Sequence, residues 1–411
     1  MLDLEFWREI GLAIRKNKLR TFLTSFSVAW GIFMVTTLLG AGNGLKNAGE
    51  YSFKSSVANL LKINPYKTSK EYRGFKEGRW IKLNNSDIKE ISQRINNVAN
   101  LNPEVYVGGN LKYKNQSLGY LTTVGVSPTI KKLQKLDITE GRFLNYNDIH
   151  QFRKVAILGT KAVEQIFGKN EDPIGKIISI NDVNFKIVGV FDGEFLDDQQ
   201  REKIFLPFTL VQKVFRQNDE INKLSMTFEG GSVHQAKVVE KEIRELLSLL
   251  HKFDPNDNRA LFIQNKSAEK ENMSLAFRYL TYFIWFISFG SIICGMIGVS
   301  NIMVIIVKER TREFGIRKAL GASPASVVNL IIMESIVITV IAGTAGLLMG
   351  VFAVDILKNS VENSMAFRNP YVDIWTAITA LIVLIVAGAA AGFIPARRAA
   401  RIRPIEALRA D

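Results

Sequence analysis

Four long stretches with almost no charged side chains constrain this 411-residue chain more than any other feature of its sequence. At about 1.5 Å of rise per residue, a helix formed by each stretch can cross a hydrocarbon core of roughly 30 Å. A buried helix of a soluble protein rarely runs so far without a charge, so the sequence predicts an α-helical membrane protein with four transmembrane helices. The stretches are residues 22–41, 279–307, 325–354 and 374–394.

Lysine and arginine are distributed unequally around these stretches. They gather before the first stretch, between the second and the third, and after the fourth, whereas the loop between the third and the fourth offers only Lys358 and Arg368. Cations close to the membrane ends of a chain stay on the cytoplasmic side. Both termini are therefore predicted to be cytoplasmic, with one large extracytoplasmic domain inserted between helices 1 and 2.

This pattern fixes the predicted organisation of the chain. The transmembrane helices are expected at residues 19–44, 276–307, 324–356 and 373–394. The parts between and after them are the outer domain with its stalk at 45–275, a cytoplasmic loop at 308–323, a short outer loop at 357–372 and a cytoplasmic tail at 395–411.

Residues 1–18 are predicted to form an amphipathic helix on the inner membrane surface. Leu2, Phe6 and Ile10 share one helical face, and a cluster of cations follows them. An ordinary solvated helix is the alternative. The apolar stretch that comes next is longer than the apolar core of a cleaved signal peptide, so it is interpreted as an anchor.

The formal net charge of +14 does not indicate a nucleic acid as the partner. Residues 1–44 carry five cations and three anions, and residues 276–411 carry thirteen cations and eight anions, in the flanks where cations set the membrane orientation. The remaining +7 is spread over the 231 residues of the outer domain, which is too dilute to name a ligand. Cys294 is the only cysteine and lies inside a predicted span, so the outer domain has no disulfide.

The outer domain is predicted to be mixed α/β. Strand-like runs include YLTTVGVS from residue 120, KVAILG from 154, KIISI and FKIVGVF between 176 and 191, and NKLSMTFEG from 222. Residues 232–252 carry apolar side chains at helical spacing behind Ser232, a plausible cap. Two lobes are expected, one of residues 53–130 joined to a later part. The run KSAEKENMSLAFRYL before the second span, without Gly or Pro, predicts a helical stalk that continues into the membrane.

The sequence contains no motif for catalysis or metal binding. His150, His234 and His251 are scattered, and none has a metal-ligand partner at the usual spacing. A nucleophile elbow and a Walker A loop are both absent, since GKNEDPIGKI from residue 168 has the wrong spacing and an Ile where Ser or Thr would hold magnesium. It is interpreted as a turn before a strand. The chain itself is therefore expected to be no enzyme and to bind no cofactor or metal.

The cytoplasmic loop KERTREFGIRKALGASP, residues 308–324, packs five cations and two anions into a helical pattern. Glu309 and Arg312 are three residues apart, and Glu313 and Arg317 are four apart in the favourable orientation for a helix pair. Gly321 is expected to stop this helix, and Ser323 with Pro324 to start the next. A purely topogenic role would explain the cations, whereas docking onto a cytoplasmic protein explains the cations and the paired acids together.

This loop and the C-terminal run IPARRAARIRPIEALRAD resemble the permease subunits of mechanotransmission ABC transporters, the group of macrolide exporters, lipoprotein-releasing permeases and the FtsX cell-division protein. Further likeness lies in NKLRTFLTSFSVAWGI, in ESIVITVIAGTAGLLMG, and in the outer-domain run from VAILG at residue 155 to VGVF at 191, which resembles a MacB-type periplasmic core domain. It is faint from residue 50 to 150.

The resemblance implies a protein of the bacterial inner membrane with its large domain in the periplasm. In that family two permeases and two ATPases assemble, and ATP-driven closure inside is passed to the outer domain. It implies a separate cytoplasmic ATPase subunit that uses ATP and Mg, a second permease subunit as a homo- or heterodimer partner, and contacts with a periplasmic adaptor, an outer-membrane channel and membrane lipids. By the same resemblance the ATPase-coupling residues are Glu309, Arg310, Arg312, Glu313, Gly315, Arg317, Lys318 and Gly321.

The third span carries candidate packing residues. Glu334 lies ten residues into it, where a carboxylate needs a partner or the bundle interior, unless the span begins later and Glu334 sits near the inner interface. Gly343, Gly346 and Gly350 allow another helix to approach closely, the last two in GxxxG register.

Three functions fit this sequence. MacB-type efflux with an adaptor and an outer-membrane channel is favoured, lipoprotein release uses the same fold, and an FtsX-like signalling scaffold would move no substrate. Adaptor genes beside this one, lipoprotein retention on depletion, and defects in dividing cells would distinguish them.

Overall fold

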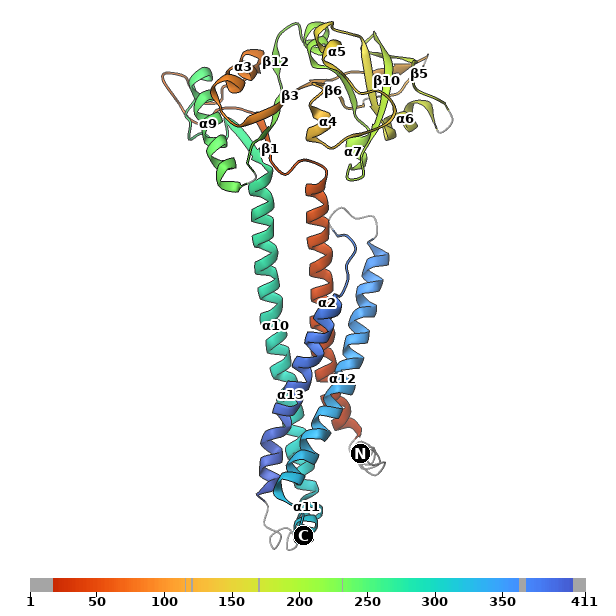
Figure 1. The fold of residues 1–411 in the computed structure, drawn as a ribbon, viewed down its shortest axis with the longest axis vertical. Helices are drawn as coiled ribbons and strands as arrows, with labels where there is room; N and C mark the ends of the chain where they lie inside the picture. The colour runs from red at the N-terminus through yellow and green to blue at the C-terminus, as the bar shows by residue number, and fades with distance from the viewer. Residues whose placement is uncertain are drawn as a thin grey trace. The chain divides into compact units, whose positions relative to one another are not determined.

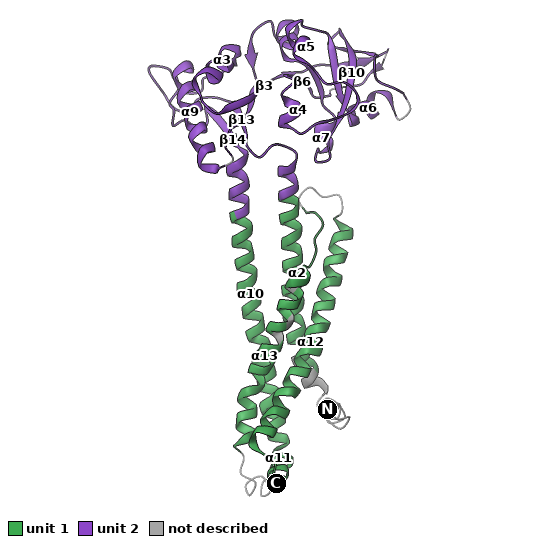
Figure 2. Cartoon of the chain, in the orientation of Figure 1, with its two compact units in different colours: residues 1–49, 275–411 green, residues 50–274 purple. Residues whose placement is uncertain are grey.

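The computed structural model describes residues 18–114, 116–119, 121–168, 171–230, 232–361 and 367–401. Two compact units are present, one of residues 1–49 and 275–411 and the other of residues 50–274 (Figure 2). The amphipathic helix predicted near the N-terminus and residues 402–411 of the predicted tail lie outside the described residues.

Helices alone build the described part of the first unit (Figure 1). Four of them are long and apolar enough to cross a membrane, in agreement with the four predicted spans. The run before the second span is helical without a break, so the predicted stalk is confirmed as the beginning of the 44-residue helix α10. The helices are α2 (Lys18–Lys54), α10 (Lys266–Glu309), α11 (Thr311–Ala319), α12 (Pro324–Ser360) and α13 (Ile374–Ala400).

Two apolar clusters hold these helices together. The first takes side chains from α2, α10, α12 and α13, with Val28, Val299, Ile338 and Ala391 among its buried members. The second joins α10, α11, α12 and α13 around Phe314, which is fully buried. The short helix α11 is therefore part of the bundle's packing, because its one large aromatic side chain lies in this second cluster.

The second unit contains a twelve-stranded sheet within the described residues. Its strand order is β14-β1-β13-β3-β6-β11-β8-β10-β9-β4-β5, and β7 pairs with β10 beside this path. The strands of this sheet are β1 (Leu60–Pro65), β3 (Val98–Val107), β4 (Leu111–Tyr113), β5 (Gln116–Ser117), β6 (Thr123–Val126), β7 (Asp137–Gly141), β8 (Val155–Gly159), β9 (Ile177–Ile180), β10 (Val183–Asp192), β11 (Ile204–Pro207), β13 (Lys223–Phe228) and β14 (Leu261–Asn265). A separate pair joins β2 (Leu83–Asn84) to β12 (Glu220–Ile221).

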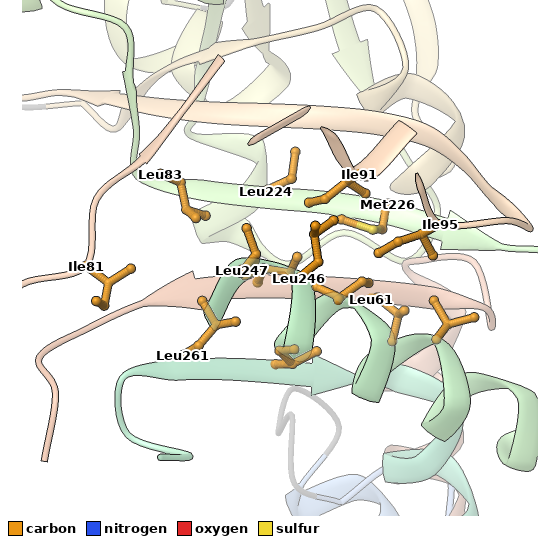
Figure 3. Packing of buried hydrophobic residues seen from close by; sticks show 14 of the residues in the cluster. Leu61, Ile81, Leu83, Ile91, Ile95, Leu224, Met226, Leu246, Leu247 and Leu261 are labelled. Atoms are coloured by element: carbon orange, nitrogen blue, oxygen red, sulfur yellow. The ribbon is translucent and has the colours of Figure 1, made fainter. Parts of the chain in front are cut away.

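Short helices cover this sheet and complete three apolar cores. One core lies between α9, α3 and strands β1, β13 and β14, where Leu61, Leu224 and Leu247 are fully buried (Figure 3). The other two form around β6, β8, β10 and β11. The helices are α3 (Asn85–Arg94), α4 (Ile130–Leu133), α5 (Tyr146–His150), α6 (Thr160–Phe167), α7 (Asp198–Arg201), α8 (Phe208–Val211), the π-helical turn η1 (Gln212–Arg216) and α9 (Val233–His251).

These cores correct the predicted lobes. The first core combines residues 61–101 with residues 221–263, as expected for an early segment joined to a later one. Residues 105–130, however, belong to the other two cores and not to the early lobe. The chain changes cores within β3, since this ten-residue strand pairs with β13 between residues 98 and 104 and with β6 between residues 105 and 107.

Local signals in the sequence are confirmed where they are strongest. Ser232 caps α9, because its hydroxyl accepts a hydrogen bond from the Gln235 N–H while the Gln235 side chain bonds back to the Ser232 N–H. The strand-like runs KIISI and FKIVGVF form the predicted strands β9 and β10, joined in a hairpin in which Asn181 and Asp182 both have positive φ, as a two-residue turn with the right twist requires. The run around Gly175 is a turn before β9, as predicted.

Candidate coupling site and helix contacts

The loop between α10 and α12 forms its predicted short helix, α11. Gly321 has φ of +95°, a left-handed conformation that favours glycine, and it follows Leu320, the C-cap residue of this helix. The Ser323 side chain then accepts a hydrogen bond from the Ser326 N–H, and Pro324 occupies the first helical position of α12. The predicted stop and start signals are therefore confirmed at the level of local structure.

Glu313 is the centre of an ion-pair network on α11. Arg310 binds it in a bidentate manner, with Nε 2.7 Å from Oε2 and an Nη atom 2.8 Å from Oε1. Arg317 adds a contact of 3.0 Å from Nη2 to Oε1, which is the predicted pair at four-residue spacing. The hydrogen bonds from Arg310, followed by the positive charges of Arg310 and Arg317, lower the pKa of Glu313 against the opposing effect of burial. The pair between Glu309 and Arg312 stays a prediction.

Arg310 also reaches the third long helix. Its Nη1 lies 3.4 Å from Oε2 of Glu334, a side chain of α12 that is only 3% exposed. Sequence reasoning left open whether Glu334 faces the bundle interior or an interface, and the structure buries it beside a cation. Arg310 therefore links α11 to α12 through two carboxylates. The two residues are 24 positions apart, so no local pattern in the sequence could pair them.

The remaining predicted coupling residues divide into two groups. Gly315 is buried, and Lys318 donates a hydrogen bond of 2.8 Å to the carbonyl oxygen of Ala400 at the end of α13, so both lie against the bundle. Glu309, Arg312 and Gly321 are exposed.

Two apolar side chains are also exposed, one on α11 and one on the residue that follows its last position. Ile316 is 44% exposed and Leu320 is 82% exposed. We call Arg312, Ile316 and Leu320 the outer face of α11. The apolar pair at four-residue spacing was visible in the sequence, but its exposure was not.

The predicted packing glycines of α12 lie against α2 or are buried. A side-chain carbon at Gly346 would overlap the backbone of Ala29, and one at Gly350 would lie 2.7 Å from Cβ of Thr36. Gly343 is buried. The partner helix of the GxxxG pair is thus α2, which the sequence alone did not indicate.

The opposite helix, α13, approaches α12 through two glycines of its own. A side-chain carbon at Gly388 would lie 2.9 Å from the hydroxyl oxygen of Thr339, and one at Gly392 would lie 2.5 Å from that of Ser335. Sequence reasoning missed Gly388 and Gly392, although their four-residue spacing is the same signal as that of the glycines in α12.

The described residues contain no group of three His, Cys, Asp or Glu side chains that could hold a metal ion. Among the three histidines, His251 places Nε2 2.9 Å from Oδ1 of Asp87, which ties the end of α9 to α3. The Asp87 carboxylate also accepts a hydrogen bond of 2.8 Å from the N–H of Asn84, the N-cap residue of α3. The contact between His251 and Asp87 therefore joins two helices of the domain and forms no metal site among the described residues.

Two stretches of the chain match known protein families. Residues 21–246 match the family described as the MacB-like periplasmic core domain, which is more than half of the chain. Residues 285–404, which include α11, α12 and α13, match the FtsX-like permease C-terminal family. The chain belongs to the MacB/FtsX-like permeases.

Among curated proteins, this MacB/FtsX-like permease is similar to macrolide export ATP-binding/permease proteins MacB. That of Bdellovibrio bacteriovorus is 27% identical over 397 residues, which cover 96% of this chain and 60% of the relative. That of Chlorobaculum tepidum is 28% identical over 402 residues, with 97% and 60% covered. The chain thus spans about three fifths of the length of these curated relatives.

One solved structure is similar to the larger match of this MacB/FtsX-like permease. The periplasmic region of MacB from Actinobacillus actinomycetemcomitans is 23% identical and gives a TM-score of 0.44. The match covers 54% of this chain and 95% of that one. With four apolar helices and a MacB-like periplasmic core domain, the protein is a multi-pass membrane protein.

Proposed function

We propose that this chain is the permease subunit of an ABC transporter, which couples ATP hydrolysis by a separate ATPase subunit to a conformational change of residues 50–274. The outer face of α11 carries this proposal. Leu320 is 82% exposed in a loop rich in cations, and together with Ile316, which is 44% exposed, it leaves a small apolar patch uncovered beside Arg312. A partner protein that covers Arg312, Ile316 and Leu320 would bury this apolar surface and meet the cation with an acidic group.

The contacts behind this face support a role in coupling. Arg310, Glu313 and Glu334 connect α11 to α12, and Phe314 packs α11 into the cluster shared with α10 and α13. A force applied to α11 is therefore passed to three long helices at once. Since α10 is continuous from Lys266, it offers a direct connection to the chain of the periplasmic domain.

The proposed location is the bacterial inner membrane, with both termini and α11 in the cytoplasm and residues 50–274 in the periplasm. The distribution of Lys and Arg around the four spans supports this orientation. In this arrangement ATP and Mg are bound by the ATPase subunit, and α11 lies on the side where that subunit works.

The proposed process is efflux, in which a second permease subunit, a periplasmic adaptor and an outer-membrane channel take part. The similarity to proteins named for macrolide export supports export over lipoprotein release or signalling. Retained lipoproteins or a division defect on depletion of this protein would favour those two functions instead.

The test replaces Leu320 by Glu in the full chain, which is co-expressed with the ABC ATPase subunit that co-purifies with the unchanged permease. Docking of the ATPase would then remove the new carboxylate from water at a cost. We therefore expect the ATPase to bind the permease at least about tenfold more weakly and to be lost on purification. Co-purification from mild detergent and ATP hydrolysis in nanodiscs measure both effects. The matched control is Leu249→Glu, since Leu249 is 60% exposed on α9 and belongs to the periplasmic domain.

Loss of the ATPase from the Leu320 variant alone would support the docking site. Equal retention of ATPase and of its stimulation in both variants would show that the outer face of α11 is not where the ATPase binds.

A further inference from the structure

A group of lysine side chains gathers on one face of the sheet in the periplasmic domain. Paired residues of neighbouring strands point to the same face. Lys62 on β1 pairs with Ser225 on β13, and Lys223 on β13 pairs with Glu104 on β3. Since Lys223 and Ser225 are two positions apart, all four side chains share this face.

Lys203 joins the group from the other half of the sheet. It precedes β11 and shares a face with Phe205, two residues later. Phe205 pairs with Val124 on β6, which in turn pairs with Tyr106 on β3. We call Lys62, Lys203 and Lys223, with Glu104 between them, the lysine cluster.

Glu104 is the carboxylate at the centre of the cluster, and two hydroxyl groups already occupy its oxygens. It is 7% exposed. The Ser225 hydroxyl donates to Oε1 at 3.0 Å, and the Tyr106 hydroxyl donates to Oε2 at 3.2 Å. The Lys223 ammonium lies 3.4 Å from the Tyr106 oxygen. In the described part of the chain no hydrogen bond or ion pair satisfies the ammonium groups of Lys62 and Lys203.

The electrostatics of the cluster reflect this excess of cations. Burial, followed by smaller effects of the neighbouring lysines, lowers the pKa of Lys62 to about 8, although Glu104 opposes the shift. Burial and Lys223 likewise lower the pKa of Lys203. One cation is enough to neutralise one buried carboxylate. The three lysines around Glu104 therefore exceed what its negative charge requires.

Nearby charges outside the cluster are engaged elsewhere. Lys266 also acts on Lys62, but its ammonium lies 2.8 Å from Glu269. Asp197 acts on Lys203, but its carboxylate caps α7 by accepting a hydrogen bond of 2.7 Å from the Gln200 N–H.

An unused donor lies on the same face. Asn102 is fully buried and pairs with Ser225 across the sheet. Its side-chain oxygen accepts a hydrogen bond of 2.8 Å from the Ser127 N–H, whereas its Nδ2 has no hydrogen-bond partner. A buried amide donor without a partner is costly, and an oxyanion is a group that would satisfy it.

We infer that the lysine cluster binds a phosphate group. Three ammonium groups against one carboxylate leave two positive charges, which match a phosphate dianion and exceed the charge of a carboxylate. Several phosphate oxygens can accept from more than one ammonium group at once, and lysine is a common point-charge ligand of phosphate. This inference does not depend on how the permease is coupled to its ATPase.

The test measures how fast the Lys62 amine of the full chain is acetylated at pH 8 by a short pulse of an N-hydroxysuccinimide ester, with mass spectrometry as the readout. Inorganic phosphate and dihexanoyl phosphatidic acid are the two probes, each compared with sodium chloride at equal ionic strength. A bound phosphate holds the ammonium form, so we expect acetylation of Lys62 to slow at least about fivefold. Lys241, exposed on α9, reports any general effect and should not change. The probe that protects at the lower concentration identifies the source, a free phosphate or a lipid head group.

Two variants distinguish binding from a purely structural cluster. Lys223→Met should weaken the protection at least about tenfold, because one charge-assisted contact is lost. Glu104→Gln keeps the acceptor for Ser225 but removes the negative charge, so it should strengthen the protection. A cluster that exists only to neutralise Glu104 would show no protection by either probe, or equal slowing at Lys241, and either result would overturn the inference.

Discussion

At the scale of single residues, Arg310 is the side chain with the most consequence for α11. It binds Glu313 on its own helix and Glu334 on α12. A bidentate arginine fixes the orientation of its carboxylate as well as its position, which a lysine could not do. The position of α11 against α12 therefore depends on a planar guanidinium between two carboxylates.

Replacing Arg310 by Gln should lower the free energy of unfolding by about 1–3 kcal/mol, because buried Glu334 loses a charged partner. Denaturation with SDS in mixed micelles measures this loss. The control Arg312→Gln changes an exposed side chain and should stay within about 0.5 kcal/mol of the parent. In the cycle with Glu334→Gln, the double variant should recover part of the loss. Strict additivity of the two single changes would mean that the contact between Arg310 and Glu334 carries no energy.

The sequence revealed only those residue contacts that lie close along the chain. Glu313 and Arg317 are four apart on one helix, so helical spacing was enough to pair them. Arg310 and Glu334 meet only after the chain has turned at Gly321. Strand pairing brings Lys62 and Lys223 together although they are about 160 residues apart in the sequence. No local pattern around either lysine predicts that the other lies beside it.

At the scale of elements, α12 lies between two helices that approach it through glycine. On one side its own Gly346 and Gly350 admit α2, and on the other Gly388 and Gly392 of α13 admit α12. The hydrophobic effect does not drive helices together in a membrane, because lipid tails are as apolar as the helix surfaces. Close backbone packing of this kind is therefore a main source of helix association.

Gly346→Ile should therefore separate α2 from α12, because the new side chain would overlap the backbone of Ala29. Overpacking of this kind costs about 1–3 kcal/mol, so we expect the detergent-solubilised protein to unfold at a lower temperature. Gly290→Ile on α10 is the matched control, since nothing lies within 4 Å of a side-chain carbon there. Equal melting temperatures of the two variants would argue against a tight contact between α2 and α12.

Elements were easier to predict than their partners. Uncharged length identified the spans, helical spacing behind Ser232 identified α9, and strand-like runs identified β9 and β10. A glycine repeat shows that some helix approaches, but its identity depends on how four helices pack together. The change of core within β3 could not be predicted for the same reason, because it depends on which strands pair with each part of β3.

At the scale of the whole molecule, the proposed orientation in the membrane can be tested by labelling. In a Cys294→Ala background, a cysteine at Asn218 should react with an impermeant maleimide in cells with a permeable outer membrane, whereas one at Arg312 should react only after lysis. Both positions are exposed in the structure, so burial cannot explain a difference. Labelling of the Arg312 site in intact cells would reverse the proposed topology.

The strand order of the periplasmic domain has a consequence for how this protein is made. β1, near residue 60, pairs on one side with β13 and on the other with β14, which ends at Asn265. Pairings so distant in sequence close slowly, because a long loop must be ordered first. The first strand must therefore wait unpaired until about 160 further residues, through β13, have been synthesised and translocated. Its second edge waits for β14, about 200 residues after β1, and both exposed edges need protection during that time.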